Sequence, residues 1–279
     1  KNSALLTNLL NYNSVLYFKE YGRGMLSTVA FRGTTASQTA VIWNGININS
    51  QMNGSTDFNT ISGTDYNSIA VKGGGGSVIY GSGAIGGTVH LNNDLRFERS
   101  FSNQLRLDYG SFNTQGIHYS SQFSNTKWSA QIGFSRNYSD NDYDYPGLFD
   151  WKGNQRFNEN GEYEVIGFNA VIGFKISDKQ ILKAYSQSSN TDRNISLLSP
   201  SESRTKYKND FSRNLLEYNG VFDQWTMNGK MAYLTEGYQY YPNKSLQQYS
   251  FGETKTWITK ADVSFQASPS FLVNTILEY

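Results

Sequence analysis

Long runs of alternating apolar and polar residues fill the chain from Asn103 onward, and they restrict its fold more than any other feature. One run puts four apolar residues two positions apart: Trp128, Ala130, Ile132 and Phe134. Because successive side chains of a β-strand point to opposite faces, each run predicts a strand with one apolar and one polar face. We count about nine such runs, which begin near residues 103, 117, 128, 166, 181, 211, 225, 256 and 271.

The lengths of the runs and of their connections indicate where such a sheet would lie. The runs reach roughly ten residues, whereas strands of soluble proteins usually have about 5 to 6. Short turns are expected at 125–127, 177–179, 223–224 and 268–270, and they alternate with long connections at 139–162, 191–210 and 239–254. Short turns at one rim and long loops at the other are typical of outer-membrane barrels. We therefore predict a transmembrane antiparallel β-barrel rather than a soluble β-sandwich.

Composition agrees with a barrel and excludes several other classes of protein. Aromatic residues make up 15% of the chain, yet hydrophobic residues reach only 38% and no window approaches 18 apolar residues, which excludes a helical membrane protein. With 24 Lys and Arg against 23 Asp and Glu, the chain has no charge bias toward nucleic acid. The absence of cysteine excludes disulfides and thiolate metal sites.

The stretch from Ile69 to Leu91 contains eight glycines, with β-branched and aromatic residues between them. Such a density predicts short extended segments joined by tight turns. Residues 81–86 also fit the G-x-G-x-x-G dinucleotide fingerprint, but that fingerprint requires a helix immediately after it. Since Gly86-Gly87-Thr88-Val89 cannot begin a stable helix, a nucleotide-binding enzyme is the weaker interpretation.

Several motifs follow one another over about 60 residues of the N-terminal third. They are Arg32-Gly33, an apolar segment ending in Asn44-Gly45, Lys72-Gly73, Tyr80-Gly81 and Gly86-Gly87. In this order they resemble the plug domain of TonB-dependent outer-membrane transporters. Lys72 and Gly74 stand where that family usually has Arg and Pro, and Asn44 stands where it usually has Asp.

The resemblance implies two domains. Residues 1–93 would form an α+β plug domain, and residues 94–279 would form the N-terminal part of the transmembrane antiparallel β-barrel that surrounds it. A barrel of about 8 strands is filled by its own side chains, whereas plugged lumens belong to barrels of about 22 strands. An open sheet edge in hydrocarbon would also leave costly unpaired backbone groups. We therefore expect a fragment with about nine of about 22 strands.

Two segments of the predicted barrel, 190–207 and 216–220, are similar to the cobalamin branch of this family. That branch binds calcium through aspartates in its outer loops, which makes Asp140, Asp142, Asp144 and Asp150 candidate Ca²⁺ ligands by resemblance. Carboxylate oxygens suit this ion. However, Tyr145 and Trp151 occupy the positions where a calcium hand has its glycine and its closing glutamate. Calcium is therefore one of two open alternatives, the other being ordinary solvated loops.

Aromatic residues of the predicted outer loops are candidates for binding a large polar ligand: Tyr143, Tyr145, Phe149, Trp151, Tyr240 and Tyr241. Amphipathic rings provide contact area at low entropic cost. The alternative is an aromatic girdle at the membrane interface, which we favour for Tyr138 and Tyr238. On the plug, Arg32 and Lys72 are candidates for pairing with a barrel carboxylate, and the lumen-facing charges of the strands are expected to pair with one another or with plug groups.

The resemblance implies energy-dependent import across the outer membrane of a Gram-negative bacterium. Its implied partners are membrane lipid, a TonB-type energising protein, a small-molecule ligand and, as an open question, a surface lipoprotein. Cobalamin is the first choice of ligand, with an iron-siderophore or haem second. A passive or adhesive barrel is the alternative of another class. No catalytic motif stands out, so no enzymatic activity is expected.

Overall fold

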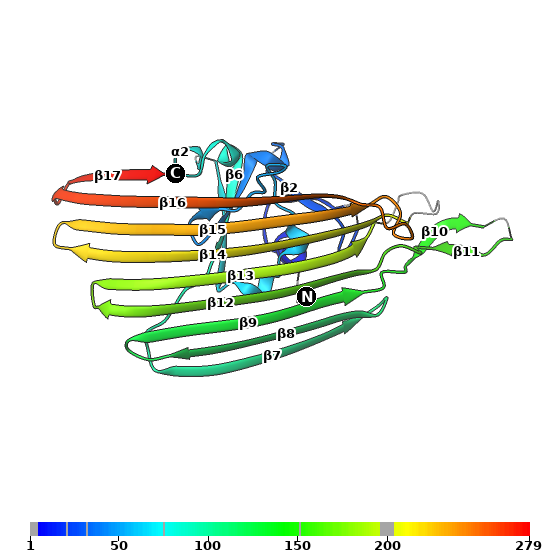
Figure 1. Cartoon of the computed structure of the whole chain (residues 1–279), viewed down its shortest axis with the longest axis horizontal. Coiled ribbons are helices and arrows are strands. Elements are labelled where there is room, and N and C mark those ends of the chain that lie inside the picture. Colours follow the sequence, from blue (N-terminus) through cyan, green and yellow to red (C-terminus); the bar gives the residue numbers. More distant parts are fainter. Residues whose placement is uncertain (1–4, 21, 32, 75, 151, 196–203) are drawn as a thin grey trace.

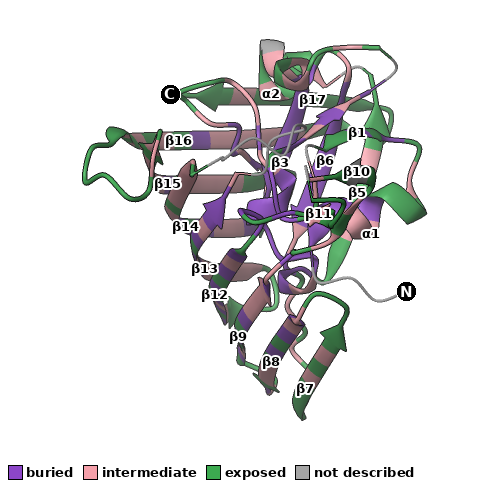
Figure 2. Ribbon diagram, turned by 90° about the vertical axis from the view of Figure 1, so that its right-hand side faces the viewer, coloured by how far each residue is buried: buried purple, intermediate pink, exposed green. Residues whose placement is uncertain are grey.

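The computed structural model describes residues 5–20, 22–31, 33–74, 76–150, 152–195 and 204–279. In these residues a broad antiparallel sheet curves around a smaller N-terminal unit (Figures 1 and 2). Nine strands of the described chain form the sheet, and each pairs with its neighbours in chain order once the β10–β11 hairpin is set aside. They are β7 (Ser100–Gly110), β8 (Thr114–Ser124), β9 (Trp128–Ser139), β12 (Tyr163–Ser177), β13 (Gln180–Asn194), β14 (Lys206–Phe222), β15 (Trp225–Tyr241), β16 (Ser250–Ser268) and β17 (Phe271–Glu278).

The alternating pattern of the sequence sorts side chains between the two faces of this sheet as predicted. On β9, Trp128, Ile132 and Phe134 are 45%, 48% and 40% exposed on the outer face, whereas Ser129 and Ser135 are buried on the inner face. Aromatic rings also pair across strands, as Trp128 does with Phe174 at a centroid distance of 4.5 Å. The apolar outer face and the polar inner face of the prediction are confirmed.

The strands run further than the apolar alternation suggested. β13 continues to Asn194 and β14 begins at Lys206, so a connection expected at 191–210 is shorter. Backbone pairing continues to Asn194 opposite Lys206 because a strand needs no apolar face beyond the membrane. Within the long connection at 139–162, β10 (Asp144–Phe149) and β11 (Gln155–Phe157) form a projecting hairpin (Figure 1).

The N-terminal unit begins with α1 (Leu6–Asn13) and the hairpin of β1 (Tyr17–Glu20) and β2 (Ser27–Ala30). A second sheet has the order β4 (Ile46–Asn47), β3 (Thr39–Trp43), β6 (Gly87–Asn92) and β5 (Ser68–Gly73), in which β3 and β6 are parallel. Short helical turns complete it: η1 (Ala36–Gln38), η2 (Phe58–Thr60), η3 (Gly63–Asp65), α2 (Ser77–Tyr80) and η4 (Ser82–Ala84). None of the helices in the described segments is long and apolar enough to span a bilayer.

The glycine-rich stretch folds back on itself between β5 and β6. Gly73 pairs with Gly87 across the two antiparallel strands, and a Cβ on Gly87 would lie 2.7 Å from the backbone oxygen of Lys72. Only a residue without a side chain fits there. Because β6, a buried strand, follows Gly86, the nucleotide-binding interpretation fails at the point where it required a helix.

The core of the N-terminal unit continues into the inner face of the large sheet. Trp43 and Phe58 are almost fully buried and belong to one apolar cluster with Tyr185 and Leu215 of the sheet. The rings of Trp43 and Tyr185 meet edge to face at 6.2 Å. Burial of these large side chains provides the main driving force for seating the unit against the sheet.

Cations of the sheet make several of the polar contacts across this interface. Lys230 Nζ donates to the backbone oxygen of Asn44 at 2.7 Å, and Lys260 Nζ donates to that of Ile79 at 3.1 Å. Within the described residues no ion pair joins Lys72 to a carboxylate of the sheet, and Arg32 lies outside those residues. The expected pairing of lumen charges does occur, for example between Arg106 and Asp108 at 2.9 Å.

The Asn44-Gly45 turn explains how Lys230 reaches the backbone. Both residues have positive φ, 47° and 90°, as the sequence pair predicts for a tight turn between β3 and β4. A Cβ on Gly45 would lie 2.2 Å from Lys230 Nζ. Glycine therefore provides both the backbone conformation and the space for the lysine.

Candidate functional site

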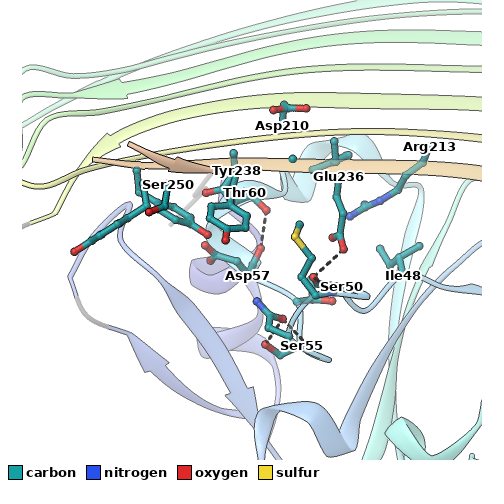
Figure 3. A pocket seen from close by; sticks show the side chains of 18 residues that line it. Ile48, Ser50, Ser55, Asp57, Thr60, Asp210, Arg213, Glu236, Tyr238 and Ser250 are labelled. Carbon is teal, nitrogen blue, oxygen red and sulfur yellow. Dashed lines mark hydrogen bonds between the residues drawn. The ribbon is translucent and has the colours of Figure 1, made fainter. Parts of the chain in front are cut away.

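A cavity of about 480 Å³ lies between the N-terminal unit and the inner face of β14, β15 and β16, toward the end of the sheet that carries the long connections (Figure 3). Its volume is in the range of about 300 to 1,000 Å³ typical of small-molecule sites. The residues that define it come from both parts of the protein: Ser50, Asp57, Thr60, Tyr207, Asn209, Asp210, Phe211, Arg213, Glu236, Tyr238 and Tyr240.

Glu236 on β15 fixes one side of the cavity to the N-terminal unit. Its Oε1 accepts hydrogen bonds from Ser50 Oγ at 2.9 Å and from the backbone N–H of Gln51 at 2.8 Å. Thr254 on β16 donates to the same oxygen at 3.1 Å. Hydrogen bonds to a carboxylate are stronger than those between neutral groups, so this residue holds the segment around Ser50 in place.

Asp57 forms the opposite link. Its Oδ1 accepts from the backbone N–H groups of Ser27 and Asn59, at 3.0 and 3.1 Å, and so caps η2. Its Oδ2 lies 2.6 Å from Arg193 Nη2 on β13, and both side chains are largely buried. Arg193 also stacks over the ring of Tyr207 at 5.4 Å. The cavity wall is therefore coupled through one ion pair to β2 of the N-terminal unit.

Aromatic rings supply the contact surface of the cavity. Tyr207 and Tyr238 stack with an interplanar angle of 21° at 5.8 Å, and Tyr240 meets Tyr207 edge to face at 6.2 Å. Below them the guanidinium of Arg213 lies 3.8 Å from the ring centroid of Phe211. Stacked rings beside amide, hydroxyl and charged groups can hold a large, flat ligand that also needs hydrogen bonds.

The structure separates the aromatic residues that the sequence placed in one binding surface. Tyr240 lines the cavity, as does Tyr238, for which the sequence favoured a place in the membrane girdle. Tyr241 instead contacts Tyr249 at 5.0 Å. The others belong to the projecting β10–β11 hairpin and its approach: Tyr143 and Tyr145 form a pair at 5.5 Å, Phe149 is 60% exposed, and Trp151 lies outside the described residues.

The four aspartates proposed for calcium do not converge. Asp140 accepts a hydrogen bond from the hydroxyl of Tyr138 at 2.5 Å, while Asp150 accepts from the backbone of Lys152 and from Asn154 within the hairpin tip. These bonds, that from the Asn154 side chain foremost, hold the pKa of Asp150 below its usual value. No group of three or more His, Asp or Glu side chains that could hold a metal is found in the described segments, Asp142 and Asp144 included. Calcium binding stays a prediction.

Sequence reasoning missed most of the cavity lining. The inward side chains of β15 could be predicted from the sequence. The odd positions carry Trp225, Met227, Met231 and Tyr233 and so face lipid, which leaves the even positions of Glu236, Tyr238 and Tyr240 facing inward. Nothing in the sequence showed that Ser50 and Asp57 would lie opposite them.

Comparisons with known proteins agree with the fold. Residues 1–88 match the family model of the TonB-dependent Receptor Plug Domain. The whole chain superposes on the FrpB iron transporter from Neisseria meningitidis (F5-1 variant) with a TM-score of 0.79 at 12% identity, covering 46% of that chain. The matched part of the chain is a TonB-dependent receptor plug domain, and the chain as a whole has the fold of these receptors. The N-terminal unit is thus the plug, and the large sheet is part of a barrel in the outer membrane of a Gram-negative bacterium.

Other relatives bear different names. The vitamin B12 transporter BtuB of Vibrio vulnificus (strain YJ016) is 32% identical to the receptor over 120 residues, which are 43% of this chain and 19% of that protein. The siderophore receptor PiuA from Acinetobacter baumannii superposes with a TM-score of 0.72 at 12% identity, and 99% of this chain covers 43% of it. The chain thus spans less than half the length of these proteins.

Proposed function

We propose that the receptor imports a scarce, large solute across the outer membrane, and that a TonB-type energising protein drives release by pulling on the plug. The observation that supports this most directly is the cavity between plug and barrel. A ligand bound there touches Ser50 and Asp57 of the plug as well as Tyr207 and Tyr238 of the barrel. Displacing the plug would therefore dismantle one wall of the site, which suits a transporter and has no purpose in a passive or adhesive barrel.

We propose cobalamin as the ligand, with an iron-siderophore or haem as the alternative. The named transporter of vitamin B12 shares sequence with this chain, whereas the iron and siderophore receptors share its fold. The charges of the cavity also favour a ligand without a large negative charge. Asp57 is paired with Arg193, and Glu236 lies on the same wall as Arg213, so the charges at the cavity are close to balanced.

In this proposal residues 1–93 act as the plug and residues 94–279 as the first part of the barrel. The receptor carries no catalytic step of its own. Membrane lipid surrounds the barrel, and a surface lipoprotein and Ca²⁺ in the outer loops would be additional to the cavity.

Direct binding of cyanocobalamin to the full-length receptor tests the proposal, with and without a calcium chelator. Tyr238→Ala should weaken binding about tenfold, because central aromatic contacts carry most of the free energy in such sites. Tyr241→Ala, which changes a ring outside the cavity on the same strand, is the matched control. Binding of a ferric siderophore but not of cyanocobalamin would establish the alternative ligand, and binding of neither would contradict the assignment of the cavity.

Growth of a deletion strain on limiting cobalamin separates import from binding. Restoration by the wild-type gene but not by the Tyr238→Ala variant is the expected result. Equal restoration by both would show that the cavity has no part in import.

A further inference from the structure

The lipid-facing side of the barrel carries a polar pair where an apolar residue is expected. Ser186 on β13 and Asn214 on β14 lie directly opposite each other. Ser186 Oγ donates to Asn214 Oδ1 at 2.9 Å, and Asn214 Nδ2 donates to Ser212 Oγ at 3.3 Å. Both members of the pair point outward, because side chains alternate between the two faces of a strand and the next residues, Gln187 and Leu215, are buried on the plug side.

The register of the sheet shows that the pair lies within the apolar band. On one side Ser186 is paired with Ala170 of β12, which is paired in turn with Ile132 of β9. On the other side Asn214 is paired with Tyr233 of β15, which is paired in turn with Trp257 of β16. Ala170 and Ile132 flank the pair on one side of this row and Tyr233 and Trp257 on the other, so the pair lies in the lipid-facing band, toward the edge of the hydrocarbon where such rings gather. Uncompensated polar groups at this depth are costly, so a hydrogen-bonding occupant would stabilise them.

A hollow of about 740 Å³ opens on the outer wall beside this pair. Its floor is formed by small residues, namely Ala130, Ala170 and Ala184. Larger side chains surround the floor, among them Leu216, Tyr233 and Trp257. Its lining comes from β9, β12, β13, β14, β15 and β16, and almost all of its exposed surface is apolar. The size falls in the range of small-molecule sites, about 300 to 1,000 Å³.

We propose that this hollow is a binding site for one membrane lipid, whose acyl chain fills the apolar part and whose ester, amide or hydroxyl group bonds with Asn214 and Ser186. The hollow is continuous with the lipid-facing surface of the barrel, so acyl chains have access to it. An amide nitrogen carries two N–H groups, and the bond to Ser212 uses one. The other donor is available to a carbonyl oxygen, which is a group that lipids carry next to their chains.

Lipid retention by the full-length receptor tests the site. The receptor is extracted from its membrane in a mild detergent, and bound lipids are counted and identified by native mass spectrometry. The wild type should retain about one lipid per receptor. The double variant Ala170→Leu, Ala184→Leu fills the hollow and should lose it, whereas Ala261→Leu, another substitution on the lipid-facing side but outside the hollow, should keep it. Asn214→Leu should weaken retention about fivefold, the effect of one hydrogen bond.

A second measurement keeps the test valid if the double variant assembles poorly. Brominated phosphatidylethanolamine in vesicles quenches tryptophans that touch it, and a receptor with Trp257 as its one lipid-facing tryptophan should be quenched more strongly than one with Trp225. Asn214→Leu should reduce that difference, and the hollow-filling double variant should remove it. Equal lipid content in the hollow-filling and control variants, equal quenching at Trp257 and Trp225, or a receptor dimer that the hollow-filling variant dissociates would each overturn the proposal, the last in favour of a second copy as the occupant.

Discussion

The buried carboxyl of Asp65 makes the plug sensitive to pH. Asp65 is 3% exposed at the end of η3, and its Oδ1 has no hydrogen-bond partner in the described part of the receptor. Burial raises the pKa of Asp65 to about 7, although the side chains of Gln187 and Asn169 partly offset that effect. Gln187 in turn accepts a hydrogen bond from Arg213, and Thr64, the neighbour of Asp65 in the chain, contacts His118.

The consequence for stability follows from the sign of this change. The folded plug keeps the proton of Asp65 between pH 4 and pH 7, whereas the unfolded plug, with an ordinary pKa near 3.8, has lost it. Stability is therefore fully present below about pH 4 and falls as the pH rises to about 7. At about 1.4 kcal/mol for each unit of pKa, the loss amounts to about 4 kcal/mol.

Asp65→Asn removes the ionisation and keeps the shape of the side chain. The backbone oxygen of Asp65, which accepts from Asn93 Nδ2 at 2.7 Å, is unaffected. We expect the variant and the wild type to be similar at pH 4. At pH 8 the amides of Asn67 and β5 should exchange with solvent up to about a thousandfold more slowly in the variant, because every 1.4 kcal/mol is a factor of about ten.

Hydrogen exchange of the two proteins at the same pH provides the measurement, since intrinsic exchange rates then cancel. Asp94→Asn, a change to an exposed carboxylate directly after the plug, is the control and should show no such pH dependence. A ratio of wild-type to Asp65→Asn exchange rates that is the same at pH 4 and pH 8 would refute the reasoning.

Three further predictions concern the interior of the plug and its contacts with the barrel. Gly87→Ala should destabilise the plug by about 1–3 kcal/mol, measured as a lower urea midpoint, because its Cβ would overlap the backbone of Lys72. Gly45→Ala should cost about 1–2 kcal/mol in the same assay, since its φ of 90° is strained for any residue with a side chain. Arg193→Gln should cost about 3 kcal/mol by leaving Asp57 buried and unpaired, and a double-mutant cycle with Asp57→Asn should recover part of that loss; additive effects would show that the pair is not coupled.

The secondary structure of the barrel could be predicted because a membrane imposes its pattern residue by residue. Each outward side chain must suit hydrocarbon, so the period of two in the sequence gives both the strands and their faces, as at Trp128 and Phe134. The turn at Asn44-Gly45 and the reversal at Gly87 were also local, since each depends on the φ of one residue or the space beside one atom. The ends of β13 and β14 could not be predicted from the local sequence, because backbone pairing continues beyond the apolar pattern.

Which residues of the plug and the barrel meet at the site was decided by the tertiary structure. Ser50 and Glu236 are 186 residues apart in the chain, and Asp57 and Arg193 are 136 apart, yet each pair is in contact. Periodicity predicts which side chains of a strand point inward, but not which plug residues they contact. Those contacts depend on how the apolar cluster of Trp43, Phe58 and Tyr185 positions the plug in the barrel. The sequence by itself therefore determined the lipid-facing wall and the turns, whereas the packing of the plug determined which inward residues line a cavity.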